Sequence, residues 1–92
     1  MKFPLGMLVM TREVNDLVAV DTPFAKFVLQ SISRHANCDW GNLPFEDIQE
    51  NNRSLKEELR LLSAYETEGL PKIWIITEAD RSATTVLFPS EY

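Results

Sequence analysis

The chain has 92 residues, 45% of them hydrophobic and 25% charged, which is enough for one hydrophobic core and too little for two domains. Its 14 acidic and 9 basic residues give a net charge of −5, which disfavours direct nucleic-acid binding because no basic cluster is visible to offset it. The apolar runs Met7–Met10 and Ile73–Ile76 are far shorter than the roughly 20 residues that span a bilayer, so we expect no membrane segment.

The first predicted element is a short apolar run from Met7 to Thr11, which follows a proline and a glycine and is most simply a buried strand. Thr11 can then serve as the N-cap of a short helix. The spacing of Val14, Leu17 and Val18 predicts about two turns with one apolar side.

A longer helix is predicted from Pro23 to about His35. Asp21 and Thr22 are good N-cap residues, and a proline is well tolerated at the first helical position because its missing N–H would have no partner there. The apolar stripe of this helix consists of Phe24, Phe27, Val28 and Ile32.

Pro44 can start a further helix, because apolar residues recur at steps of three or four as far as Leu59. A break is an equally good interpretation. Asn51 is a weak helix former, and Ser54 with Glu57 has the spacing of a capping box that would restart a second helix. We therefore expect two or three helices before the last third of the chain.

The last third predicts three strands joined by short turns. Arg60–Glu66 alternates in polarity, and the β-rich runs Lys72–Glu78 and Ala83–Pro89 flank the polar turn Ala79–Ser82. The expected fold class is α+β, with residues 1–92 in a single domain. We expect a short N-terminal strand, two to three helices and a three-stranded antiparallel meander packed on the helices.

His35 and Cys38 are the only histidine and cysteine, and they could approach one another across a helix end. Catalysis would need an activated thiolate and an orienting group such as Asp39, whereas a buried thiol and a helix-terminal histidine explain both residues more simply. Structural zinc needs four Cys or His ligands, and the isolated glycines form no phosphate loop, so we expect no metal, cofactor or enzymatic activity. A lone cysteine forms no intramolecular disulfide, which favours a cytoplasmic location.

Two regions are candidate binding surfaces. Acidic residues gather between Asn37 and Glu58, either as a solvated helix face or as a docking surface for a basic protein, including a nucleic-acid-binding one. Asp80 and Arg81 lie at an exposed hairpin tip, either as a binding surface or only as a capped, salt-bridged turn.

Trp40 fits an interface anchor or a core residue equally well, whereas Trp74 is expected in the core or on a helix-covered face. The candidate partner-binding residues are Asp39, Trp40, Glu46, Asp47, Glu50, Asp80 and Arg81.

Five segments give the chain a family resemblance: CDWG at 38–41, SAYE at 63–66, and above all KIWIITE at 72–78 with DRSATT at 80–85 and LFP at 87–89. They resemble a family of small uncharacterised bacterial proteins, described as plasmid-related, that are carried on plasmids and integrated mobile elements. The resemblance covers most of the chain from Met7 onward. This chain differs from the family at Leu55–Leu59, where similar proteins often contain a glycine.

The resemblance implies a setting, since small acidic proteins of mobile elements often act by binding. We therefore expect a non-enzymatic protein-binding accessory protein, with inhibition of a host defence complex of the CRISPR or restriction type as the leading hypothesis. Three alternatives stay open. These are an antitoxin or regulator of a basic partner, a small enzyme or ligand-binding domain using His35 and Cys38, and a subunit that forms a homodimer through a strand edge at Met7–Thr11 or Ala83–Phe88.

Overall fold

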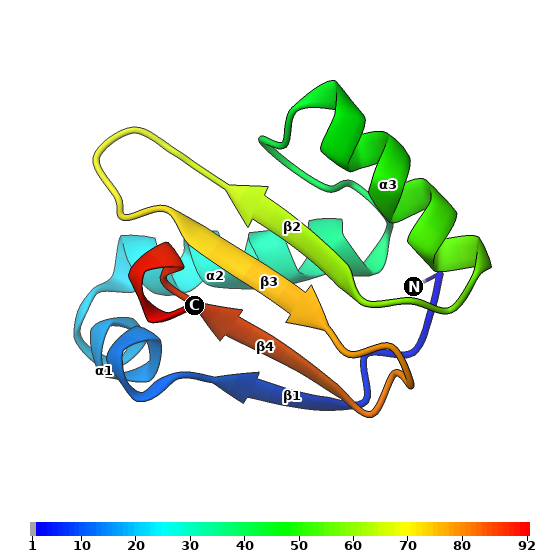
Figure 1. Cartoon of the computed structure of the whole chain (residues 1–92). Helices are drawn as coiled ribbons and strands as arrows, with labels where there is room; N and C mark the ends of the chain where they lie inside the picture. The colour runs from blue at the N-terminus through cyan, green and yellow to red at the C-terminus, as the bar shows by residue number, and fades with distance from the viewer. Residues whose placement is uncertain (1) are drawn as a thin grey trace.

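A four-stranded mixed sheet organises the computed structural model, which describes residues 2–92 (Figure 1). The strand order is β1-β4-β3-β2, with β1 parallel to β4 and the other neighbours antiparallel. The α+β class is therefore confirmed. In chain order the elements are β1 (Met7–Met10), α1 (Arg12–Val20), α2 (Thr22–Ala36), α3 (Phe45–Lys56), β2 (Leu61–Tyr65), β3 (Ile73–Thr77), β4 (Ala83–Leu87) and a short 3-10 helix, η1 (Pro89–Glu91).

The first two helices begin where the capping residues predict. The Thr11 hydroxyl accepts a hydrogen bond from the N–H of Val14, and the Asp21 carboxylate accepts one from the N–H of Phe24 at 3.0 Å. The predicted stripe of α2 is buried against the sheet. None of the helices in residues 2–92 combines the length and the apolar character that a membrane span requires.

Helix α3 is continuous, so the predicted break at Asn51 does not occur. The Asn51 side chain is buried and bonds the backbone of Leu62 in β2, which offsets its weak helix propensity. The predicted extension to Leu59 is also wrong. Glu58 adopts a left-handed conformation, with φ 56°, and turns the chain into β2 after Lys56.

Strand β1 corrects the predicted sheet. It joins the meander as a parallel strand at the edge, so the sheet has four strands, and β1 is not buried: Met7 is 71% exposed, Leu8 45% and Val9 37%. Gly6 permits this pairing, because its φ is +66° and a side chain there would meet the backbone of Ser82. Since β4 lies between β1 and β3, the predicted dimer edge at Ala83–Phe88 is also wrong.

The two faces of the sheet are covered differently. In Figure 1 helix α2 lies behind the sheet and α1 at its lower left, and together they bury the main core against the sheet, whereas α3 lies beside β2. Side chains alternate along a strand, so Ile73 and Ile75 enter this core and Trp74 points to the opposite side, where it is half-buried. We call that side the open face. Its sheet residues are Met7, Val9, Leu62, Ala64, Trp74, Ile76, Ala83, Thr85 and Leu87.

Candidate functional site

His35 is fully buried and belongs to a chain of hydrogen bonds between α2 and three strands. Its Nδ1 lies 2.5 Å from the Ser63 hydroxyl and its Nε2 lies 2.8 Å from the Thr77 hydroxyl. The Thr77 hydroxyl is in turn 2.8 Å from that of Thr84, which donates to the carbonyl of Leu5 at 2.7 Å. Every polar group of this buried chain therefore has a partner.

The order of these bonds determines the tautomer of His35. A threonine hydroxyl has one proton, and Thr84 gives its proton to Leu5, so Thr84 accepts from Thr77. Thr77 must then accept from His35, which places the imidazole proton on Nε2 and leaves Nδ1 to accept from Ser63. Burial, with a smaller contribution from the charge of Arg81, lowers the pKa of His35 to about 4. The imidazole is therefore neutral.

This arrangement leaves no free nitrogen on His35 to activate Cys38, because Ser63 and Thr77 occupy both. Burial also raises the pKa of the Cys38 thiol, which disfavours the nucleophilic thiolate. Across residues 2–92, no three His, Cys, Asp or Glu side chains are placed to hold a metal ion. The catalytic alternative based on His35 and Cys38 therefore has no geometric support.

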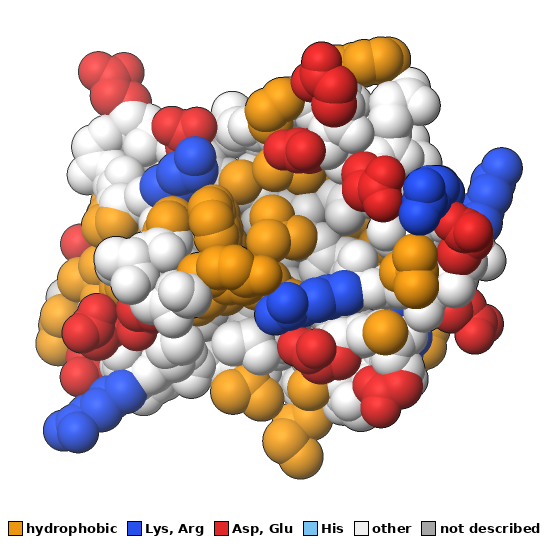
Figure 2. Space-filling model, viewed as in Figure 1, with side chains coloured by type: hydrophobic (Ala, Val, Ile, Leu, Met, Phe, Trp, Pro, Cys, Tyr) orange, Lys and Arg blue, Asp and Glu red, His pale blue; other side chains and the backbone are white. Residues whose placement is uncertain are grey.

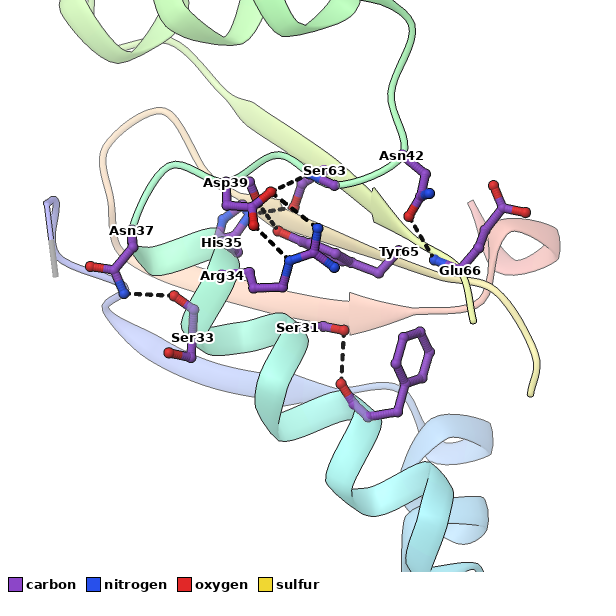
Figure 3. A network of polar contacts seen from close by, with 12 residues as sticks. Ser31, Ser33, Arg34, His35, Asn37, Asp39, Asn42, Ser63, Tyr65 and Glu66 are labelled. Carbon is purple, nitrogen blue, oxygen red and sulfur yellow. Dashed lines mark hydrogen bonds and ion pairs between the residues drawn. The ribbon is translucent and has the colours of Figure 1, made fainter. Parts of the chain in front are cut away.

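Asp39 and Trp40 hold the loop after α2 in place. The Arg34 guanidinium donates to both oxygens of Asp39, at 2.7 and 3.2 Å, and lies over the ring of Tyr65 (Figure 3). The bond from Arg34 holds the pKa of Asp39 below its usual value. Trp40 is only 3% exposed and packs with Phe3 and His35, so it is a core residue and not a surface anchor.

At the hairpin tip, Asp80 and Arg81 are joined to the fold. The Asp80 carboxylate accepts from the N–H of Ser82 at 3.0 Å. Hydrogen bonding from the side chain of Ser82, and then from its backbone, lowers the pKa of Asp80. Arg81 reaches across to the end of α3 and donates to the carbonyl of Leu59 at 2.7 Å and to that of Glu78 at 3.1 Å. Both residues therefore have structural contacts that explain their presence.

The acidic residues of α3 have fewer structural contacts. Glu46, Asp47 and Glu50 are all exposed, and Glu50 has one loose ion pair, 3.7 Å to Arg53. Glu46 and Asp47 lie in the first turn of α3, where carboxylates complement the helix dipole. Of the seven candidate binding residues, these three leave their carboxylates most available to a partner.

Two shallow grooves cross the open face beside these carboxylates. One, of about 320 Å³, lies between α3 and β2 and is lined by residues that include Asp47, Glu50 and Leu62. The other, of about 360 Å³, runs over β3 and β4 and is lined by residues that include Ile76 and Leu87. We call them the α3 groove and the sheet groove. In Figure 2 hydrophobic side chains gather over the middle of this face, and acidic ones lie above and below them.

Arg60 and Tyr92 line both grooves and separate them. The Arg60 guanidinium lies 5.5 Å from the centre of the Tyr92 ring and 3.8 Å from Glu78. Tyr92 in turn packs edge-on against Trp74. The lining of the two grooves contains one cation, Arg60, and four carboxylates: Asp47, Glu50, Glu78 and Glu91.

Sequence reasoning found the α3 carboxylates but not the grooves. It missed Arg60, Glu91 and Tyr92, and it placed Trp74 in the core or on a helix-covered face, whereas Trp74 is half-buried on the open face. These residues come from separate parts of the chain and meet only through the strand pairing. One signal was available. The run Ile73–Thr77 is apolar at almost every position, which is typical of a strand with both faces partly covered, whereas the prediction placed packing on one face only.

Comparison with models of known protein families, with curated proteins and with solved structures finds no significant match. The resemblance to plasmid-related proteins therefore stays a prediction, and the candidate site depends on the geometry alone. That geometry is an apolar floor with a mainly acidic rim. It is suited to holding a side chain and to attracting positive charge.

Proposed function

We propose that this chain is a non-enzymatic protein-binding module whose open face receives a basic segment of another protein. The observation that carries the proposal is the pair of grooves with an apolar floor and four carboxylates against Arg60 alone. Apolar contact supplies affinity, and complementary charge selects the partner and speeds its approach. The net charge of −5 also attracts a basic partner at long range.

The partner segment that fits best carries one or two large apolar side chains flanked by lysine or arginine. The apolar side chains would enter the grooves beside Leu62 and Ile76, and the cations would meet Asp47, Glu50 and Glu78. Arginine suits this role because its flat guanidinium binds carboxylates with two bonds and stacks on aromatic rings.

Proteins that bind nucleic acids present such basic surfaces, and we propose this class of partner. A host defence complex of the CRISPR or restriction type is the leading candidate, because the mobile-element resemblance implies that setting and because acidic groups can occupy a surface meant for phosphates. We place the interaction in the cytoplasm, a reducing compartment compatible with the free thiol of Cys38. An antitoxin-like role would use the same surface on a basic partner encoded nearby.

Affinity purification from a bacterial host, followed by mass spectrometry, would first identify a partner. The purified partner would then be titrated with the wild type, with Asp47→Asn/Glu50→Gln, and with Glu13→Gln/Asp16→Asn as a control. Both double variants remove two exposed charges, but the control residues, on α1, line neither groove. We expect the groove variant to weaken binding at least tenfold and the control to weaken it less than threefold.

Two results would overturn the proposal: retention of no host protein at low salt, or equal affinities of the two double variants for the purified partner. A further readout is amide chemical-shift mapping. Partner-induced shifts should fall on β3, β4 and α3, and shifts confined to the outer face of α2 would also contradict the proposed site.

A further inference from the structure

The two edges of the sheet are finished in different ways. Beside β2, the Asn51 side chain bonds both backbone groups of Leu62. The Ala64 N–H donates to the carbonyl of Trp40, and its carbonyl accepts from the N–H of Asn42. No further strand can therefore pair along the middle of β2 without breaking bonds that already exist.

The β1 edge is open. Met7 donates its N–H to the carbonyl of Ser82, just before β4, at 2.9 Å, and Thr11 donates to that of Val86 in β4 at 3.0 Å. Backbone groups alternate in direction along a strand, so those of Leu8 and Met10 point away from the sheet. No strand of residues 2–92 lies beyond β1, and the preceding segment turns away, because Phe3 is buried beside Trp40.

The β1 edge carries no side chain that blocks further pairing. Natural edge strands are kept short or carry a lysine, a proline or a bulge; Met7–Met10 is short, but all four of its residues are apolar. Hydrophobic side chains project from the lower edge of the molecule in Figure 2, where β1 lies. An uncharged strip is also the place where a chain of net charge −5 can approach its own copy with the least repulsion.

We propose that two copies of this chain form a homodimer by antiparallel pairing of their β1 strands. With the two-fold axis at Val9, Leu8 of each copy faces Met10 of the other, and about four new backbone hydrogen bonds form. This register uses the whole strand. The product is one continuous sheet of eight strands, four from each copy. Because the β2 edges are closed, assembly stops at the dimer and does not continue into a fibre.

A second copy fits this edge better than an extended peptide from another protein. The two-fold axis makes the strand complementary to itself, and Val9 then meets Val9 on the open face. This inference is independent of the proposed function, because no β1 residue lines either groove. The Asp47→Asn/Glu50→Gln variant should therefore still dimerise.

Sedimentation equilibrium at micromolar concentration tests the dimer with Val9→Lys and a matched control, Val20→Lys. Val20 is an exposed valine at the end of α1, so both variants add one charge to an exposed apolar position. We expect twice the chain mass for the wild type and for Val20→Lys, and the chain mass for Val9→Lys. A monomeric wild type, or a dimeric Val9→Lys, would overturn the proposal. A monomer would leave β1 available to a strand of another protein.

Oxidative cross-linking tests the register. In a Cys38→Ser background, Val9→Cys should form a covalent dimer at least tenfold faster than Leu8→Cys. Opposed residues at a non-hydrogen-bonded antiparallel position have Cα atoms about 4.5 Å apart, within the range of a disulfide. In the proposed register Leu8 faces Met10 and not its own copy. Equal rates of cross-linking would contradict the proposed pairing.

Discussion

The side-chain amide of Asn51 pairs with both backbone groups of Leu62, donating to the carbonyl and accepting from the N–H at 3.1 Å. A single residue of α3 thus does what a neighbouring strand would do. We expect Asn51→Ala to lower the free energy of unfolding by about 2 kcal/mol, because two partly buried backbone groups lose their partner. Urea denaturation would measure the loss.

Gln49→Ala is the control for this prediction, since Gln49 lies exposed on the same helix. Its stability should stay within about 0.5 kcal/mol of the wild type. Asn51→Asp removes only one of the two hydrogen bonds, because a carboxylate can still accept from the N–H of Leu62 but cannot donate to its carbonyl. Equal stabilities of Asn51→Ala and Gln49→Ala would show that the pairing contributes little.

Acid should destabilise the fold through His35. The folded-state pKa of about 4 lies below the ordinary value of 6.5, so the unfolded state binds a proton first as the pH falls. The stabilisation is complete above pH 6.5, decreases as the pH falls toward 4, and changes no further below that. The total is on the order of 3 kcal/mol.

Unfolding free energies from about pH 7.5 to pH 4.5 would test this, with His35→Gln as the comparison. Glutamine does not titrate in this range and carries both a donor and an acceptor for Thr77 and Ser63. Carboxylates titrate alike in both proteins, so the difference between the two curves isolates the histidine. Parallel curves would mean that His35 is not the titrating group.

Arg81 should contribute to stability more than to binding. Its guanidinium joins the hairpin tip to the carbonyl of Leu59, and this contact is lost in Arg81→Ala. We expect a loss of about 1–2 kcal/mol by thermal or chemical unfolding. Arg12→Ala, which removes an almost fully exposed arginine with one 4.0 Å ion pair, should change stability by less than about 0.5 kcal/mol. A larger effect at Arg12 than at Arg81 would contradict this prediction.

Gly41 and Gly69 form a matched pair for testing close packing. Both have positive φ, +76° and +82°, so alanine is strained by about 1–2 kcal/mol at either position. Only at Gly41 would the added methyl group also meet the carbonyl of Ala64 and the ring of Tyr65, whereas the site at Gly69 is open. Gly41→Ala should therefore lower the melting temperature clearly more than Gly69→Ala, and equal shifts would argue against the tight contact.

Local signals predicted most of the secondary structure, because they depend on neighbouring residues. Thr11 and Asp21 cap their helices as expected, and the turn at Ala79–Ser82 joins two strands. The errors occurred where distant segments decide the outcome. The exposure of β1 depends on its pairing with β4, and the continuity of α3 depends on the contact between Asn51 and β2.

The candidate site was harder to predict for the same reason. The acidity of α3 is visible in the sequence, since it needs only composition and helical spacing. The grooves need the register of three strands, the return of Tyr92 over Trp74 and the position of Arg60 between them. The role of Trp40 was ambiguous in the sequence, and its burial depends on Phe3 reaching it from the other end of the chain.

The hydrogen-bonded chain through His35 has a consequence for how the sheet aligns during folding. Sliding β4 along β3 by two residues would keep apolar side chains on the same faces, so hydrophobic packing alone tolerates the error. Such a slip would place Val86 opposite Thr77 in place of Thr84 and leave the proton of the buried Thr77 hydroxyl without an acceptor. The buried polar residues thus favour the native register of β3 and β4 over a register shifted by two residues, which apolar packing alone would also allow.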